Sequence, residues 1–264
     1  YKTVIHIIIA TNPEAKFFIN YLKLKKINSI KEFQIYFNEK FSLTISGIGK
    51  INSAISVCTT YHELGKIKNN CWINIGIAGH SSNIVGELFI VNKIIDRASL
   101  KNYYPYSPNI TNISQLSCTT YDNVDQKYSE SLSDMELSGF YKTANKYSYR
   151  ELIHSLKIVS DNRQNPFNYD EKDKIEKMFE AKKKHFDIFF EKVLKIWSEN
   201  ITDQKEINFK IESLLSKIKT TKSEYEQIKK LLRLMYLKKI NFETNLFKSK
   251  IDAKKILSSL RKMI

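Results

Sequence analysis

Three acidic side chains occupy points of the sequence where a strand is expected to end or a helix to begin. Glu14 follows an apolar run, Glu136 follows Met135, and Asp161 follows Ser160 at the end of a second apolar run. Open α/β sheets bind their ligands at the carboxyl ends of strands. Two carboxylates in different surroundings can divide general acid and general base work. The pattern predicts acid–base chemistry at one edge of a sheet.

Each of these residues also has an ordinary structural explanation. Glu14 suits the positive end of a helix dipole, and Asp161 suits the N-cap of a following helix. Glu136 fits a surface acid and Met135 fits core packing. Taken singly, these explanations are favoured, whereas the acids together, in this order, favour a site.

The first acid is expected on a strand-to-helix connection. Residues 4–10 form a short, β-branched apolar run, which is typical of a strand buried on both faces. Asn12 then fits a helix cap, Pro13 the first helical position and Glu14 the first turn. The helix is expected to continue through residues 15–22.

Small residues mark two further strand ends. The string Ser46-Gly-Ile-Gly-Lys50 follows a predicted strand pair and precedes a helix expected over residues 51–64. Glycines at such a turn let backbone amides approach an anion or a hydroxyl-rich ligand closely. Another buried strand begins at Cys71 and ends in Gly-Ile-Ala-Gly79. A strand over 153–159 leads to Asp161, and residues 96–108 are expected to form a tyrosine-rich loop.

These segments together resemble the superfamily of purine nucleoside phosphorylases and methylthioadenosine/S-adenosylhomocysteine nucleosidases. The matching strings are Ser46-Gly-Ile-Gly-Lys50, Asn74-Ile-Gly-Ile-Ala-Gly79, Met135-Glu136 and Ser160-Asp161. The resemblance implies an α/β fold, with a mixed central sheet between two helix layers (αβα), over a nucleoside phosphorylase-like domain at residues 1–200. It leaves residues 201–264 unmatched.

The resemblance also implies roles for single residues. Glu14 would activate a water, Asp161 with Ser160 would meet the purine base and share a proton with its N7, and Met135 and Glu136 would hold the ribose. The remaining substrate-binding residues implied are Ile48, Gly49, Ala78, Gly79, Val124 and Lys157.

Several positions depart from the family pattern. Asn74 stands where the bacterial hexameric phosphorylases carry a phosphate-binding arginine, which favours water over phosphate as the nucleophile. Ile77 replaces a serine common in the nucleosidases, and Lys157 replaces an arginine. Both changes touch groups that would position the water, so they weaken the prediction of full activity. The chain between Gly79 and Met135 is also shorter than in the nucleosidases, which implies a more open pocket.

Composition limits the remaining possibilities. A chain of 264 residues with 42% hydrophobic content can bury one core and a helical appendage. It lacks a continuous apolar run of about 18 residues and a recognisable signal peptide. The three cysteines, Cys58, Cys71 and Cys118, have no metal-ligand spacing, which suggests a reducing compartment and a cytoplasmic protein.

The C-terminal third has a helical pattern throughout. A long helix is expected over residues 170–199, and three apolar stripes in 201–264 predict a helical hairpin or small bundle. Basic residues outnumber acids there by about two to one, so a nucleic acid or a protein stays open as a partner. The net charge of +15 permits such binding, but abundant Lys, Ile and Asn also explain it as compositional bias.

Three functions remain open. The first is a nucleosidase that hydrolyses an adenine nucleoside such as methylthioadenosine, S-adenosylhomocysteine or 5′-deoxyadenosine. The second is a purine nucleoside phosphorylase. The third is a catalytically weak module that binds nucleosides, with a tail that binds nucleic acid or protein. The resemblance implies a homodimer, and no cofactor, metal or membrane contact is predicted.

Overall fold

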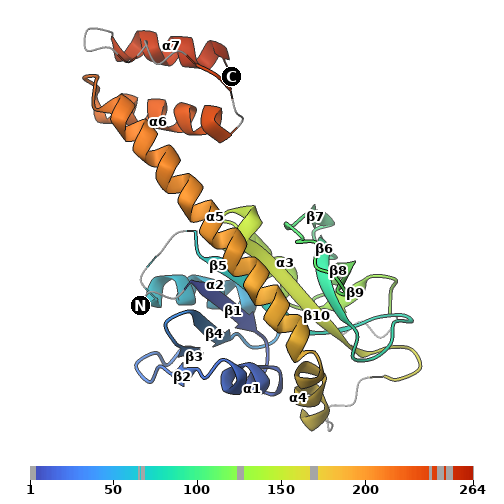
Figure 1. Ribbon diagram of the computed structural model, residues 1–264. Helices are drawn as coiled ribbons and strands as arrows, with labels where there is room; N and C mark the ends of the chain where they lie inside the picture. Colours follow the sequence, from blue (N-terminus) through green and yellow to red (C-terminus); the bar gives the residue numbers. More distant parts are fainter. Residues whose placement is uncertain are drawn as a thin grey trace. The chain divides into compact units, whose positions relative to one another are not determined.

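The computed structural model describes residues 4–64, 66, 69–123, 128–166, 172–237, 240–242, 247 and 252–263. The chain divides into two compact units, Tyr1–Trp197 and Ser198–Ile264 (Figure 1). The first unit contains the sheet and the predicted site, and the second unit is helical.

A mixed sheet forms the middle of the first unit. Along the path β10-β6-β8-β9-β5-β1-β4-β3-β2, β1 pairs in parallel with both β4 and β5, and β5 pairs in parallel with β10. The strands are β1 (Ile5–Ile9), β2 (Lys25–Lys26), β3 (Gln34–Phe37), β4 (Phe41–Ile45), β5 (Cys71–Gly79), β6 (Leu88–Asp96), β7 (Lys101–Tyr103), β8 (Ser114–Thr120), β9 (Leu132–Asp134) and β10 (Ile153–Asp161).

The sheet closes on itself on one side of β5. β10 pairs with both β5 and β6, β6 continues to β8 and β9, and β9 returns to β5 through the pair Gly79 and Ser133. The register also shifts in β10 between Val159 and Asp161. This closure brings the end of β9, and the residues after it, next to the carboxyl end of β5.

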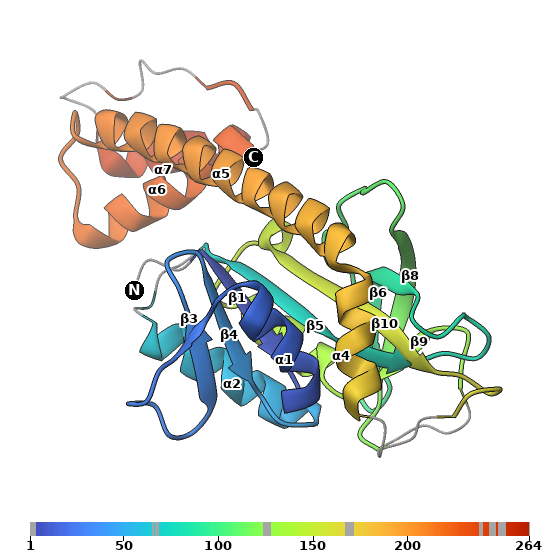
Figure 2. The same ribbon diagram turned by 60° about the horizontal axis from the view of Figure 1, so that its bottom comes forward.

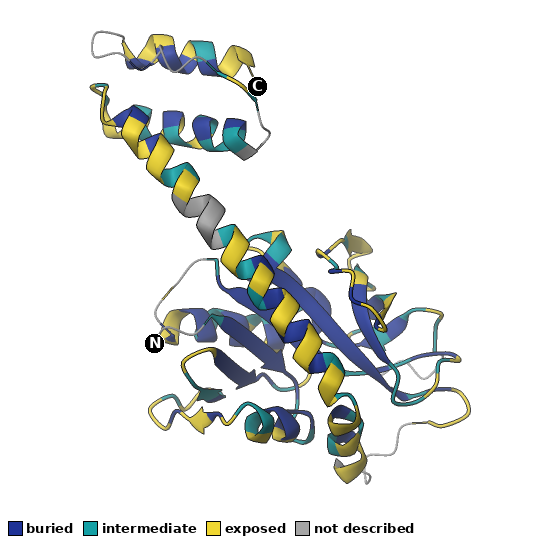
Figure 3. Cartoon of the chain, viewed as in Figure 1, coloured by how far each residue is buried: buried dark blue, intermediate teal, exposed yellow. Residues whose placement is uncertain are grey.

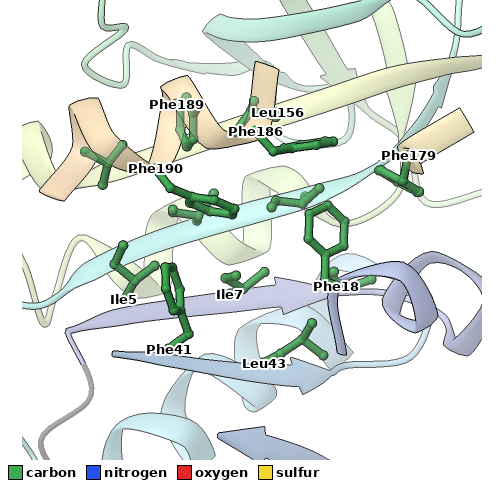
Figure 4. Packing of buried hydrophobic residues seen from close by; sticks show 14 of the residues in the cluster. Ile5, Ile7, Phe18, Phe41, Leu43, Leu156, Phe179, Phe186, Phe189 and Phe190 are labelled. Carbon is green, nitrogen blue, oxygen red and sulfur yellow. The ribbon is translucent and has the colours of Figure 1, made fainter. Parts of the chain in front are cut away.

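Helices α1 (Asn12–Tyr21) and α4 (Lys172–Ala181), with the first part of α5 (Lys183–Leu215), cover one face of the sheet (Figure 2). Their contact is largely aromatic: Phe18, Phe179 and Phe186 meet edge-on or tilted, over the isoleucines of β1 (Figure 4). Offset and edge-on ring pairs are the favoured aromatic geometries. The odd-numbered isoleucines of β1, which include Ile5 and Ile7, point into this layer.

Helices α2 (Lys50–Glu63) and α3 (Leu137–Ala144) cover the opposite face. Ile8 of β1 points to this side, where it joins Val57 of α2 and Phe140 of α3. Alternate strand residues thus enter different helix layers, as the pleat requires. Strands β1, β4, β5 and β10 are almost entirely buried, whereas the helices carry exposed residues (Figure 3). The expected αβα fold with a mixed sheet is therefore confirmed.

Three details differ from the sequence-based predictions. Thr11, rather than Asn12, caps α1, because Thr11 and Glu14 form a capping box. The loop expected over residues 96–108 contains the short strand β7, which pairs with β6. The single helix expected over 170–199 is two helices, because α4 ends at Ala181 and α5 starts at Lys183. α5 also continues to Leu215, beyond the expected end.

The second unit consists of the last part of α5 with α6 (Lys222–Leu237) and α7 (Ala253–Met263). Its buried core includes Ile211 of α5, Ile228 and Leu232 of α6, and Ile256 of α7. At the surface, Lys229 of α6 pairs with Glu212 of α5 at 2.6 Å. The expected small helical bundle is therefore present.

Candidate active site

The Glu14 carboxylate is held at the first turn of α1 by three hydrogen bonds. Its Oε2 accepts bonds from the Thr11 amide at 2.9 Å and the Thr11 hydroxyl at 2.6 Å, and its Oε1 accepts the Ile77 amide of β5 at 2.9 Å. Glu14 is 3% exposed. A carboxylate has about four acceptor positions. Three of them are therefore occupied, and one is left for a further donor.

Gly76 provides the space that this carboxylate occupies. A β-carbon on Gly76 would lie 2.9 Å from Glu14 Oε1 and 3.4 Å from Lys157 Nζ. Lys157 reaches this place because it pairs with Gly76 across the parallel strands β5 and β10. The Glu14 carboxylate and the Lys157 ammonium therefore converge on one point above β5.

Lys157 forms a buried ion pair with Asp134. Its Nζ lies 2.8 Å from Asp134 Oδ2, and the two side chains are 1% and 0% exposed. Burial alone would lower the pKa of Lys157, but the negative charges of Asp134 and Glu136 outweigh it and raise the pKa overall. The ammonium therefore stays charged inside the protein.

Glu136 stands at the start of α3 and contacts the glycine turn before α2. Its Oε1 accepts the Gly49 amide at 2.8 Å, and Gly49 has a φ of 101°, which a residue with a side chain rarely adopts. Burial, followed by the charge of Asp134, raises the pKa of Glu136 to about 7; Lys157 acts in the opposite direction, and Glu14 adds to the increase. Glu136 is thus electrostatically linked to Glu14.

Asp161, the last residue of β10, pairs with Gly79 at the end of β5. A β-carbon on Gly79 would lie 3.1 Å from both Asp161 Oδ2 and Tyr128 Cε1, and the Ser160 hydroxyl donates to Asp161 Oδ1. Gly79 lies three positions beyond Gly76 along β5, or about 10 Å. The structure therefore brings Glu14, Glu136 and Lys157 together, and it sets the half-buried Asp161 at the far end of the same stretch.

The other predicted site residues lie around these two positions. Ala78 is buried on β5 between them, and Met135 is partly buried beside Glu136. Ile48 is adjacent to Gly49 but is 53% exposed. Val124 lies outside the described residues.

Two residues at the site had no role in the sequence-based prediction. Asp134 was visible as one of two acids flanking Met135, but only the closure of β9 onto β5 reveals its pairing with Lys157. Tyr128 had no sequence signal, because its place beside Gly79 depends on a backbone turn with a φ of 44°. The Tyr128 carbonyl also accepts Arg163 Nη2 at 3.2 Å.

The sequence matches neither a family model nor a curated protein. Its structure is similar to that of the Arabidopsis thaliana 5′-methylthioadenosine nucleosidase, with a TM-score of 0.58 and 16% identity over 74% of this chain and 96% of that one. A Chlamydia trachomatis nucleosidase (MTAN) aligns with a TM-score of 0.52 and 17% identity, over 66% of this chain and 92% of that one. At the level of fold, the resemblance predicted from sequence is confirmed.

Within the described residues, every helix is too short or too polar to cross a membrane.

Proposed function

We propose that this protein is a nucleosidase that hydrolyses the N-glycosidic bond of an adenine nucleoside. The observation that carries the proposal is the Glu14 carboxylate, buried against Gly76 with one acceptor position left and electrostatically linked to Glu136, while Asp161 lies beside Gly79, about 10 Å farther along β5. N-glycosidic cleavage needs a base for the attacking water and an acid at the leaving group. The spacing suits groups that act at opposite ends of a nucleoside.

In this proposal Glu14 takes a proton from water and Glu136 accepts hydrogen bonds from the ribose hydroxyls. Glu136 would then stabilise the positive charge that develops on the sugar as the bond breaks. Met135 would pack against the sugar. Glu136 Oε1 accepts the Gly49 amide at 2.8 Å and Oε2 accepts the Met135 amide at 3.3 Å, so the remaining acceptor positions of the carboxylate would receive the ribose hydroxyls.

At the other end, Asp161 would share or donate a proton to the base. The Ser160 hydroxyl bonded to Oδ1 leaves Oδ2 facing the space over Gly79. Tyr128 lies against the same space, and its ring suits stacking on a purine. We therefore assign Tyr128 the role of stacking on the base.

Water rather than phosphate is the proposed nucleophile. Asn74 is 1% exposed and donates to the Ile8 carbonyl at 3.2 Å, so it supplies no positive charge to an incoming anion. Ile77 contributes only its backbone amide, and Lys157 is engaged by Asp134. Because the Ile77 side chain has no hydrogen-bonding group and Lys157 shares its ammonium with Asp134, we expect slower hydrolysis than a hydroxyl and an arginine would support.

The test is adenine release measured by chromatography, with and without phosphate. Methylthioadenosine, S-adenosylhomocysteine and 5′-deoxyadenosine are the substrates to compare. We expect release without phosphate, and a loss of at least about 100-fold in kcat for Glu14→Gln and for Asp161→Asn. Strict phosphate dependence would indicate a phosphorylase, and unchanged nucleoside after long incubation would indicate a binding module.

A second candidate function concerns the C-terminal unit alone. Residues 198–264 contain 16 Lys and Arg against 8 Asp and Glu, so they hold +8 of the chain's net charge of +15. Compositional bias alone would spread this charge evenly. A groove of about 610 Å³ between α6 and α7 is lined by Lys254, Arg261 and Lys262 as well as Glu224. We propose that this surface binds a nucleic acid.

This second proposal predicts salt-sensitive binding to single-stranded RNA or DNA. Replacement of Lys254, Arg261 and Lys262 by Gln removes three charges, so we expect weaker binding and a smaller salt slope in a gel-shift assay. Lys183, Lys184 and Lys192 of the first unit serve as a matched control triple. Equal losses in the two triples would indicate a general charge effect instead of a site.

A further inference from the structure

The buried ion pair between Asp134 and Lys157 belongs to a larger hydrogen-bond network at the start of α3. Asp134 Oδ2 accepts both Lys157 Nζ at 2.8 Å and the Leu137 amide at 2.9 Å, and Oδ1 accepts the Thr120 hydroxyl at 2.8 Å. The Thr120 oxygen in turn accepts the Ser138 amide at 3.0 Å. One carboxylate therefore satisfies a buried cation, a hydroxyl and the first amide of a helix.

We propose that Asp134 is a positioning residue of the candidate site, which fixes Lys157 and the first turn of α3 and thereby sets where the Glu14 and Glu136 carboxylates stand. The inference rests on the function proposed above. It gives Asp134 no contact with a substrate, because the Asp134 side chain is fully buried.

The link to Glu136 runs through the backbone. Glu136 immediately precedes α3, whose first two amides are held by Asp134 and Thr120. A displaced first turn would move Glu136 away from the Gly49 amide. Because a misplacement of about 1 Å at an active site can reduce catalysis by about 100-fold, this anchoring is functionally significant.

The link to Glu14 runs through Lys157. The ammonium stands within 3.4 Å of the point above Gly76 that the Glu14 carboxylate also approaches. Without Asp134, the nearest anions to Lys157 would be Glu14 and Glu136, and the buried cation would be drawn towards them. Asp134 thus keeps Lys157 from forming a tight ion pair with either the Glu14 or the Glu136 carboxylate.

The charges of Asp134 and Lys157 also affect the pKa of Glu136, which a change in packing alone would leave the same. The groups facing Glu136 are Asp134 of β9, Lys157 of β10 and Glu14 of α1; Asp134 and Glu14 raise the pKa of Glu136, whereas Lys157 lowers it. Removing Asp134 should therefore move the titration of Glu136 to lower pH. Removing the charge of Lys157 should move it to higher pH.

The experiment is an NMR titration of the Glu136 carboxyl carbon in protein labelled with ¹³C-glutamate, assigned with Glu136→Gln. Wild type is compared with Asp134→Asn, Lys157→Met and the uncharged control Thr120→Val, which breaks the same network. Near-UV circular dichroism checks folding, and if one charge variant does not fold, the other carries the test. We expect opposite shifts of at least half a pH unit for the two charge variants and none for Thr120→Val.

Activity gives the second readout. In Asp134→Asn we expect kcat on methylthioadenosine to fall about 100-fold and its pH profile to move with Glu136. Unchanged Glu136 midpoints in both charge variants, or an equal shift in Thr120→Val, would overturn the inference. If wild type releases no adenine, the proposed function fails, but the titration still decides the role of Asp134.

Discussion

At the level of single residues, the fold changes the pKa of Glu136 in a way that can be tested. Burial and the charge of Asp134 raise its pKa from an ordinary value of 4.5 to about 7. When folding raises the pKa of an acid, the protonated acid favours the folded state. This contribution to the free energy of unfolding is fully present at pH values below the pKa of the acid in the unfolded chain. It is lost as the pH rises through the pKa of the acid in the folded protein. The relevant window is therefore about pH 4.5 to 7.

Glu136→Gln should remove this pH dependence. Relative to the variant, wild type should lose on the order of 3 kcal/mol of unfolding free energy between pH 4.5 and 7.5, because its ionised carboxylate is disfavoured when folded. Urea denaturation of both proteins at several pH values measures the difference. A constant difference across the range would contradict the raised pKa.

Substitutions at Gly76 and Gly139 can distinguish a change in the candidate site from a change in helix packing. A β-carbon on Gly76 would meet side-chain ends, Glu14 Oε1 at 2.9 Å and Lys157 Nζ at 3.4 Å, whereas one on Gly139 would lie 2.0 Å from the Lys50 carbonyl oxygen. Flexible side chains can shift, but a helix backbone cannot do so cheaply. The two positions therefore test different things.

We expect Gly139→Ala to destabilise the fold by about 3 kcal/mol or more, since it forces α2 and α3 apart. Gly76→Ala should cost less stability, but it should displace Glu14 and reduce adenine release by at least about tenfold. Thermal denaturation and kinetic assays on both variants provide the comparison. Full activity of Gly76→Ala would mean that adenine release does not depend on the observed position of the Glu14 carboxylate.

At the scale of elements, the aromatic layer under α4 and α5 carries much of the packing of the first unit. Phe186 is fully buried, and its ring contacts those of Phe18 and Phe179 (Figure 4). Truncating such a residue leaves a cavity that neighbours fill only in part. The residue thus fixes α1, and with it Glu14, against the sheet.

Phe186→Ala should lower the unfolding free energy by about 3–5 kcal/mol. Ile188→Ala on the same helix is the matched control, because Ile188 is 48% exposed and should change stability by less than about 1 kcal/mol. Chemical denaturation measures both. Similar losses in the two variants would mean that α5 is held by something other than this layer.

At the scale of the whole molecule, the start of α2 presents an apolar stripe. Ile51 and Ile55 of α2 are 71% and 49% exposed, and Ile48, in the turn just before the helix, is 53% exposed. Clustered exposed apolar side chains mark interaction surfaces more often than isolated ones do. We propose that a second copy of this chain covers the stripe, which would complete the homodimer implied by the family resemblance.

Ile51→Lys with Ile55→Lys should therefore convert a dimer into a monomer. Light scattering coupled to size-exclusion chromatography measures the mass, and Ile188→Lys on α5 is the control for an added surface charge. A monomeric wild type at micromolar concentration would exclude this assembly. An unaffected dimer in the double variant would assign it to another surface.

Much of the first unit could be predicted from the sequence. β-branched runs identified β1, β5 and β10, and the Thr-Asn-Pro-Glu segment identified the start of α1, because these signals are local. Family strings then placed Glu14, Glu136 and Asp161 at strand or helix ends. The break at Lys182 and the strand β7 were missed, since helical periodicity continues across the former and tertiary pairing creates the latter.

Only the tertiary structure decided how these ends meet. The return of β9 to β5, a pairing of residues more than 50 positions apart, brings Asp134 to Lys157 and Glu136 to Gly49. The backbone turn at Tyr128 likewise sets a ring beside Asp161 and Gly79. Local propensity carries no information on such distant pairings, because they depend on how the whole sheet closes. The ion pair at the centre of the site therefore emerged from packing, not from a motif.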